Sequence, residues 1–151
     1  MSLVDEVGGG LDGLAQLRAV MSSGSKAGIL QSLKFDFVEI EPGRAVLAGT
    51  PGDHAYNPIG SVHGGYAATL LDSACACAVH SQLLSTQRLA TLDLNVSFHK
   101  TITRDTSSLR AEGHVRTLGR KVAFAEATLT DSGGRLYASA TSTVLIIERQ
   151  G

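Results

Sequence analysis

The pattern of apolar and polar residues divides the chain into strand-like segments on either side of one long apolar run. From Tyr66 to Val79 almost every residue is apolar or small, so a helix over this run has no polar face. A helix that is apolar all round is typical of a buried position. The pattern therefore predicts a long buried helix, in which Asp72 is the one charged residue.

Alternation of apolar and polar residues predicts strands before and after this helix. In the clearest case, 91–98, one face would hold Leu92, Leu94, Val96 and Phe98, and the other Thr91, Asp93, Asn95 and Ser97. Further strands are predicted at 35–40, 44–50, 109–117, 121–130 and 136–147, between turns that contain glycine or proline. Five or six mostly antiparallel strands that curl round one apolar helix would cover it, which makes the fold α+β.

The N-terminal region has a different pattern. Residues 1–10 end in three glycines and are expected to be loose. Leu11, Leu14, Leu17 and Met21 then recur at helical spacing and predict a short amphipathic helix that stops at Ser22–Gly24. We expect residues 1–30 to form an N-terminal extension with this helix, and residues 31–149 to form the main domain.

Composition and charge exclude several kinds of partner. The net charge of the 151 residues is −1 and the basic residues are scattered, so neither nucleic acid nor an anionic membrane surface is an expected partner. The apolar run is interrupted by Asp72 and His80, which does not fit a membrane span. The first ten residues carry acids where a signal peptide would carry Lys or Arg, so we expect a cytoplasmic protein.

No metal or disulfide is expected. Cys75 and Cys77 are the only cysteines, and on a helix they would point about 200° apart, which suits neither a disulfide nor a shared metal ion. Outside the helix start, the histidines have no metal-ligand spacing on a common face. We interpret both cysteines as small core residues.

The segment before the long helix has the chemistry of a binding site. Asn57, Pro58 and Gly60 predict a turn, and Gly64 and Gly65 lie in the first turn of the helix. The N–H groups of a helix start have no partner within the helix, and glycines leave them accessible to an oxygen atom of a ligand. Asp72 follows two turns later, and a buried acid costs free energy unless it is paired or used.

Distance prevents one chain from completing such a site. Gly64 and Asp72 are eight residues apart, which is roughly 12 Å along a helix. Attack on a carbonyl needs the activating group and the donors to the carbonyl oxygen within about 3 Å of neighbouring atoms. A second copy, related by a twofold axis, would bring Gly64 of one subunit near Asp72 of the other.

These residues together resemble a known family. The ordered set Asn57, Pro58, Gly60, His63, Gly64, Gly65, Leu70 and Asp72, followed by Thr91, Asp93 and Asn95, is similar to the hotdog-fold acyl-CoA thioesterases. The nearest group is the PaaI-like (phenylacetate-pathway) branch of the 4-hydroxybenzoyl-CoA thioesterase superfamily. The resemblance implies an antiparallel sheet of five or six strands wrapped round the helix, and a homodimer, often paired into a homotetramer, with active sites at the subunit interface.

The resemblance also implies roles for single residues. Asn57 and the Gly64 N–H would polarise the thioester carbonyl, and Asp72 would act as general base or nucleophile, with Thr91 orienting the water. His63 would support the loop and, with Gly65, contact the substrate. No cofactor is implied, because coenzyme A enters only as part of the acyl-CoA substrate. The basic turn with Arg116, Gly119 and Arg120 either contacts the phosphates of coenzyme A or is an ordinary solvated hairpin.

The sequence is compatible with two other functions. The stretch GDHAYNPIG comes close to the pattern of hotdog enoyl-CoA hydratases and dehydratases, but two extra residues separate Asp53 from Asn57, and Gly60 stands where the catalytic histidine would be. A non-catalytic acyl-CoA binding protein is the second alternative, because a fold alone does not establish activity. The sequence leaves the acyl group open among aryl-acetyl, hydroxylated aryl and medium-chain acyl groups.

Overall fold

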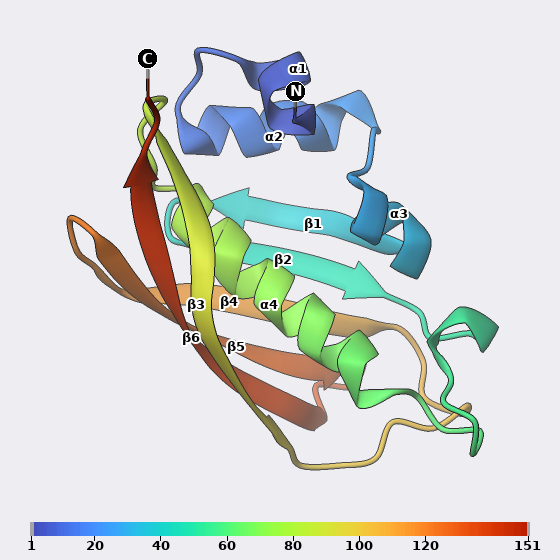
Figure 1. Cartoon of the computed structure of the whole chain (residues 1–151). Helices are drawn as coiled ribbons and strands as arrows, with labels where there is room; N and C mark the ends of the chain where they lie inside the picture. The colour runs from blue at the N-terminus through green and yellow to red at the C-terminus, as the bar shows by residue number, and fades with distance from the viewer. Residues whose placement is uncertain (1, 151) are drawn as a thin grey trace.

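The computed structural model describes residues 2–150 (Figure 1). The helices are α1 (Leu3–Gly8), α2 (Gly13–Ser23), α3 (Gly28–Leu33) and α4 (Gly64–His80), with a 3-10 turn η1 (Asp53–Ala55). The strands are β1 (Phe35–Glu41), β2 (Arg44–Gly49), β3 (Gln87–Phe98), β4 (Leu109–Leu118), β5 (Val122–Asp131) and β6 (Leu136–Glu148).

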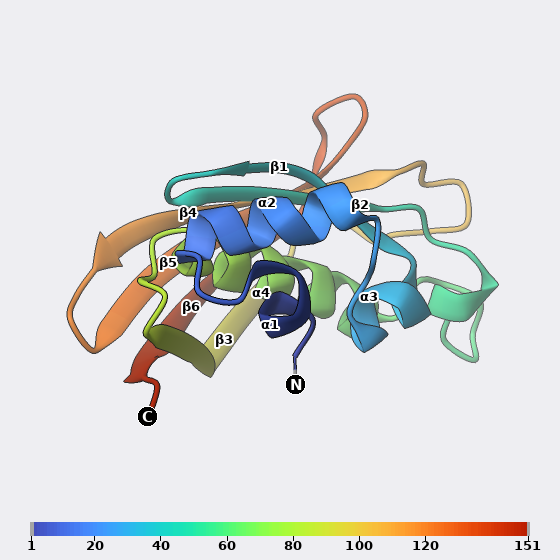
Figure 2. The same ribbon diagram turned by 90° about the horizontal axis from the view of Figure 1, so that it is seen from above.

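All six strands join one antiparallel sheet in the order β1-β2-β4-β5-β6-β3. The sheet curves round α4, while α1 and α2 lie near the end of α4 where its C-terminus is (Figures 1 and 2). The predicted arrangement of one long helix inside an antiparallel sheet is confirmed, and it has six strands rather than five. No helix within residues 2–150 is long and apolar enough to cross a membrane.

Small residues let the sheet approach the helix closely. A side chain at Gly113 of β4 would lie 2.3 Å from the carbonyl oxygen of Ala74, so only glycine fits there. Leu70, Leu71 and Cys75 of α4 are fully buried against the strands. The close contact between α4 and β4 therefore fixes both the position and the rotation of the helix.

One side of α4 is open, which differs from the prediction of a helix covered all round. Gly64 and Gly65 are exposed, and Thr69, Asp72 and Ala76 are only partly buried. The reason is geometrical, because a single curved sheet covers one side of a helix. The small side chains of the open side made the helix look uniformly apolar in the sequence.

The N-terminal residues are more ordered than predicted. Residues 3–8 form α1, which begins where the Ser2 hydroxyl accepts a hydrogen bond from the Asp5 N–H at 3.2 Å. The Asp5 carboxylate also forms an ion pair of 2.7 Å with Arg149, near the C-terminal end of the described chain. The expectation that residues 1–10 are loose is therefore wrong for residues 3–8, and residue 1 lies outside the described residues. The helix α3 was not predicted either.

The simple alternation predicted for β3 is interrupted by a bulge. The register with β6 shifts between Thr91 and Asp93, and Leu92 is 57% exposed, although the pattern placed it with the core residues. Leu94 and Val96 pack against the core as predicted. The bulge takes up one residue, so Thr91 lies on the same side of the strand as Leu94. A similar shift in β1, after Phe37, brings Ile40 into the core.

Candidate active site

The turn before α4 is closed by the side chain of Asn57. Its Oδ1 atom accepts hydrogen bonds from the N–H groups of Ile59 and Ser61, both at 3.1 Å. Its Nδ2 atom donates to the Ser61 hydroxyl at 2.9 Å, which leaves one of its two amide hydrogens for a ligand. Gly60 adopts a φ of +89°, a conformation that favours glycine. Sequence reasoning missed Ser61, whose only signal was its place four residues after Asn57.

His63 caps the start of α4. Its Nδ1 atom accepts a hydrogen bond from the Gly65 N–H at 2.8 Å, and its own backbone N–H donates to the Ala55 carbonyl. This contact fits the predicted supporting role of His63 and occupies the N–H of Gly65. The N–H of Gly64 makes no hydrogen bond to any residue within 2–150. Of the two glycines, Gly64 is therefore the one that presents a free donor.

A hollow of about 290 Å³ lies beside this donor. It is lined by Gly64, by Phe98 at the end of β3 and by Lys100 in the following loop. A side chain at Gly64 would come within 3.2 Å of the Phe98 ring, so the glycine keeps both the hollow and the N–H accessible. We call Asn57 and Gly64 the donor half of the site.

Asp72 and Thr91 meet on the open side of α4. The Thr91 hydroxyl donates a hydrogen bond to Oδ1 of Asp72 at 3.1 Å, across 19 positions of sequence. Asp72 is partly buried, while Thr91 is exposed. The bulge in β3 makes this contact possible, because strict alternation would direct the Thr91 side chain away from the helix. We call Asp72 and Thr91 the acid half of the site.

The two halves are separated within one protomer. β3 lies antiparallel to α4, since Phe98 lies beside Gly64 at the start of the helix and Thr91 contacts Asp72 two turns later. Eight helical residues between Gly64 and Asp72 correspond to roughly 12 Å. The helix is continuous over this span, so no bend brings the free N–H and the carboxylate together.

The basic hairpin lies away from both halves. The start of β4 lies near the start of α4, because Leu109 pairs with Gly49 and Gly49 lies against Tyr66. Further along β4, Gly113 lies against Ala74, in the middle of the helix. β4 thus follows the direction of α4, and its turn to β5 lies beyond the C-terminal end of the helix (Figure 1). Arg116 is held by Glu126 at 2.7 Å. The hairpin also contains Gly119 and Arg120, and phosphate binding there stays a prediction.

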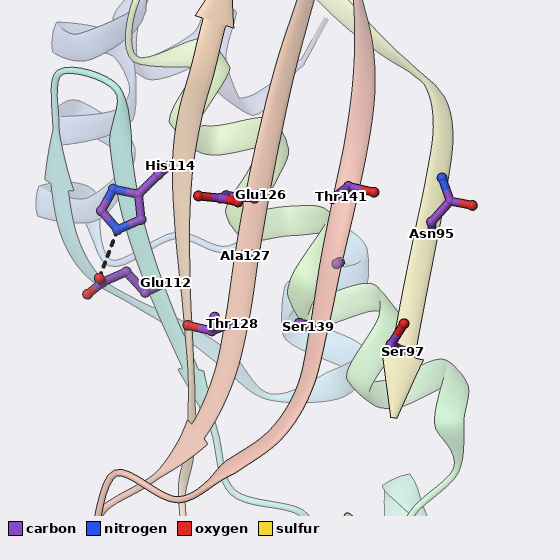
Figure 3. A pocket seen from close by; sticks show the side chains of 10 residues that line it. Asn95, Ser97, Glu112, His114, Glu126, Ala127, Thr128, Ser139 and Thr141 are labelled. Carbon is purple, nitrogen blue, oxygen red and sulfur yellow. Dashed lines mark hydrogen bonds and ion pairs between the residues drawn. The ribbon is translucent and has the colours of Figure 1, made fainter. Parts of the chain in front are cut away.

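A second hollow, of about 410 Å³, lies on the opposite face of the sheet (Figure 3). Its side chains come from β3 to β6 and are mostly polar. At its edge, the Glu112 carboxylate forms hydrogen bonds with His114 and with Arg44, both at 2.8 Å. The hydrogen bonds from His114 and Arg44 lower the pKa of the Glu112 carboxyl. Asn95, one of the residues that carry the resemblance, lines this hollow, but no residue with a predicted role in the site does. We therefore place the candidate site on the helix side of the sheet.

The chain resembles known proteins in both sequence and structure. Residues 59–138, more than half of the chain, match the Thioesterase superfamily. A thioesterase family protein from Silicibacter pomeroyi has a TM-score of 0.77 and 24% identity, over 85% of this chain and 96% of that chain. A thioesterase from Haemophilus influenzae has a TM-score of 0.80 and 16% identity, over 89% of this chain and 92% of that chain. None of the curated proteins compared with the sequence matches it.

A structure from Streptococcus mutans, bound to acetyl CoA, is similar with a TM-score of 0.69 and 25% identity, over 78% of this chain and 91% of that chain. The matched family segment contains α4 with both Gly64 and Asp72, and it continues through β3. The six-stranded antiparallel sheet round one long helix is the hotdog fold of these thioesterases. The chain therefore belongs to the Thioesterase superfamily and is a hydrolase that acts on thioester bonds.

Proposed function

We propose that the protein is an acyl-CoA thioesterase of the PaaI-like branch, which hydrolyses an acyl- or aryl-acyl-CoA thioester to the free acid and coenzyme A. The observation that carries the proposal is the hydrogen bond from Thr91 to Asp72 on the open side of α4. It holds a carboxylate at a position that a substrate can reach, in a chain whose family acts on thioesters.

The active enzyme is a homodimer in this proposal. β3 is an edge strand of 12 residues with only β6 as a partner among the described strands, and it exposes Leu92 and Phe98. A long edge strand with exposed apolar residues tends to pair with another strand. Antiparallel pairing of two β3 strands about a twofold axis between Thr91 and Phe98 would exchange their ends. Gly64 of one subunit would then lie near Asp72 of the other.

Hydrolysis follows from this pairing. The Gly64 N–H and the free amide hydrogen of Asn57 donate to the thioester carbonyl oxygen and stabilise the negative charge that develops there. Asp72 of the other subunit takes a proton from a water molecule that Thr91 helps to orient, and the water oxygen attacks the carbonyl carbon. The carbon–sulfur bond then breaks, and the thiolate of coenzyme A leaves and takes up a proton. Direct attack by Asp72, through an anhydride, is the alternative first step.

A screen of acyl-CoA thioesters with a free-thiol readout tests the proposal. We expect release of coenzyme A from at least one thioester by the wild-type protein, and loss of that release in Asp72→Asn. Asp105→Asn is a matched control, because Asp105 is an exposed acid in the loop after β3. Crotonyl-CoA belongs in the panel, since loss of its enoyl absorbance without thiol release would indicate a hydratase. Binding of acyl-CoA without any turnover would indicate a binding protein.

A further inference from the structure

A groove of about 660 Å³ lies between α1, the C-terminal end of α4 and the ends of β3 and β6. Val4 of α1, His80 of α4, Leu89 of β3 and Ile147 of β6 line it. This volume is within the range of small-molecule binding sites. We call it the α1 groove. None of the residues predicted for the active site lines it.

The α1 groove lies further along α4 and β3 than the acid half, toward the C-terminal end of the helix. Leu89 and Thr91 are two residues apart before the bulge in β3, so they share a face of the strand, and the groove begins about 7 Å from Thr91. On the helix, Asp72, Ala76 and His80 follow one another at a spacing of four and are all partly exposed. His80 is therefore roughly 12 Å beyond Asp72 along the helix and about 80° further round it.

The charges of the groove balance one another. The Asp5 carboxylate pairs with Arg149 at 2.7 Å, and Arg88 and Glu148 at the rim add one charge of each sign. Burial, and to a lesser degree Arg149, lowers the pKa of His80, so its imidazole is neutral near pH 7. The ring is also held by Gln16 at 2.9 Å. The balanced charges give the phosphates of coenzyme A no net attraction. The partly buried side chains of Val4, Leu89 and Ile147 instead offer an apolar chain a surface to pack against.

We propose that the α1 groove binds the far end of the acyl group, so that the preferred substrates are extended acyl-CoA thioesters of medium chain length. This inference rests on the proposed thioesterase function and adds a substrate class to it. An extended chain advances about 1.25 Å per methylene, given carbon–carbon bonds of about 1.5 Å. The 12 Å from Asp72 to His80 then correspond to roughly eight to ten carbons, and a four-carbon acyl group would end before the groove.

Hydrolysis of a series from butanoyl- to dodecanoyl-CoA tests the inference. We expect kcat/KM of the wild-type protein to rise up to decanoyl-CoA, by at most roughly fourfold for each methylene that becomes buried. Leu89→Trp fills the groove from β3 and should lower kcat/KM for decanoyl-CoA at least about tenfold while changing the value for butanoyl-CoA less than about twofold. Val4→Trp should have the same selective effect from α1. Val38→Trp, on the exposed edge strand β1, is the matched control and should leave the series unchanged.

Two results would overturn the inference. One is a wild-type series in which chain length has no effect. The other is an equal loss for all chain lengths in the tryptophan variants, which would mean that the groove holds coenzyme A instead. If no thioester is hydrolysed, the proposed function fails, and affinities for the same series measured by calorimetry still test the groove. Thermal unfolding of each variant, followed by circular dichroism, separates a filled groove from an unfolded protein.

Discussion

The donor half and the acid half of the proposed site lie on one helix but are built by different kinds of contact. Asn57 and Gly64 are positioned by hydrogen bonds to residues a few places away in the chain. Asp72 is positioned against Thr91, 19 residues away, and only because a bulge turns Thr91 toward the helix. The first half is thus encoded in a short motif, while the second depends on the register of a strand. In the proposed dimer, each half is completed by the opposite half of the second subunit.

The largest effect is expected from removing the acid. Asp72→Asn keeps the size of the side chain and removes the base, so kcat should fall by about a thousandfold, within the range for general base catalysis. Steady-state rates of thiol release measure this loss. The mass of the assembly in light scattering should be unchanged, and full activity in Asp72→Asn would remove the acid half from the site.

A smaller loss, of about a hundredfold in kcat, is expected when the donor half loses its side-chain donor. Asn57→Asp is the sharper variant, because it keeps the oxygen that accepts from Ile59 and Ser61 but removes the amide hydrogens. Its rate is compared with that of Ser61→Ala, which removes a neighbouring hydroxyl and should retain more activity. Equal rates for the two variants would mean that Asn57 only closes the turn.

Mixing the two inactive variants tests whether the halves come from different subunits. After exchange of subunits between Asp72→Asn and Asn57→Asp, half of the dimers are mixed, and each mixed dimer has one intact site. Activity should therefore recover to about a quarter of the wild-type value. Native mass spectrometry confirms the exchange. Confirmed exchange without recovery would place both halves of the site in the same subunit.

The smallest effect is expected at Thr91. Thr91→Val keeps the shape of the side chain and removes the hydroxyl that contacts Asp72, so we expect about a tenfold loss in kcat, the equivalent of one hydrogen bond of about 1.4 kcal/mol. Thr91→Ser retains the hydroxyl and is the matched control. Its kcat should stay close to that of the wild-type protein, and a similar loss in both variants would indicate a packing role.

Much of the fold was readable from the sequence because the signals were local. The long run of small and apolar residues predicted α4, and turn residues separated most strands at nearly their observed ends. The helix start was equally readable, since Asn57, His63 and Gly64 act within a few residues of one another. The short amphipathic helix that ends near Ser23 was predicted and is α2, but the bulges and the six-residue helices α1 and α3 were missed. α1, for example, depends partly on an ion pair between Asp5 and Arg149, at opposite ends of the chain.

The sequence by itself determined which residues are available, namely a helix start with a free donor and an acid two turns later. Only the tertiary structure decided on which side of β3 the Thr91 hydroxyl lies, and which side of α4 is open. The physical reason is that alternation along a strand specifies faces only while the register is regular. Once a bulge shifts the register, pairing with β6 decides the direction of each side chain, and that pairing forms only in the folded chain.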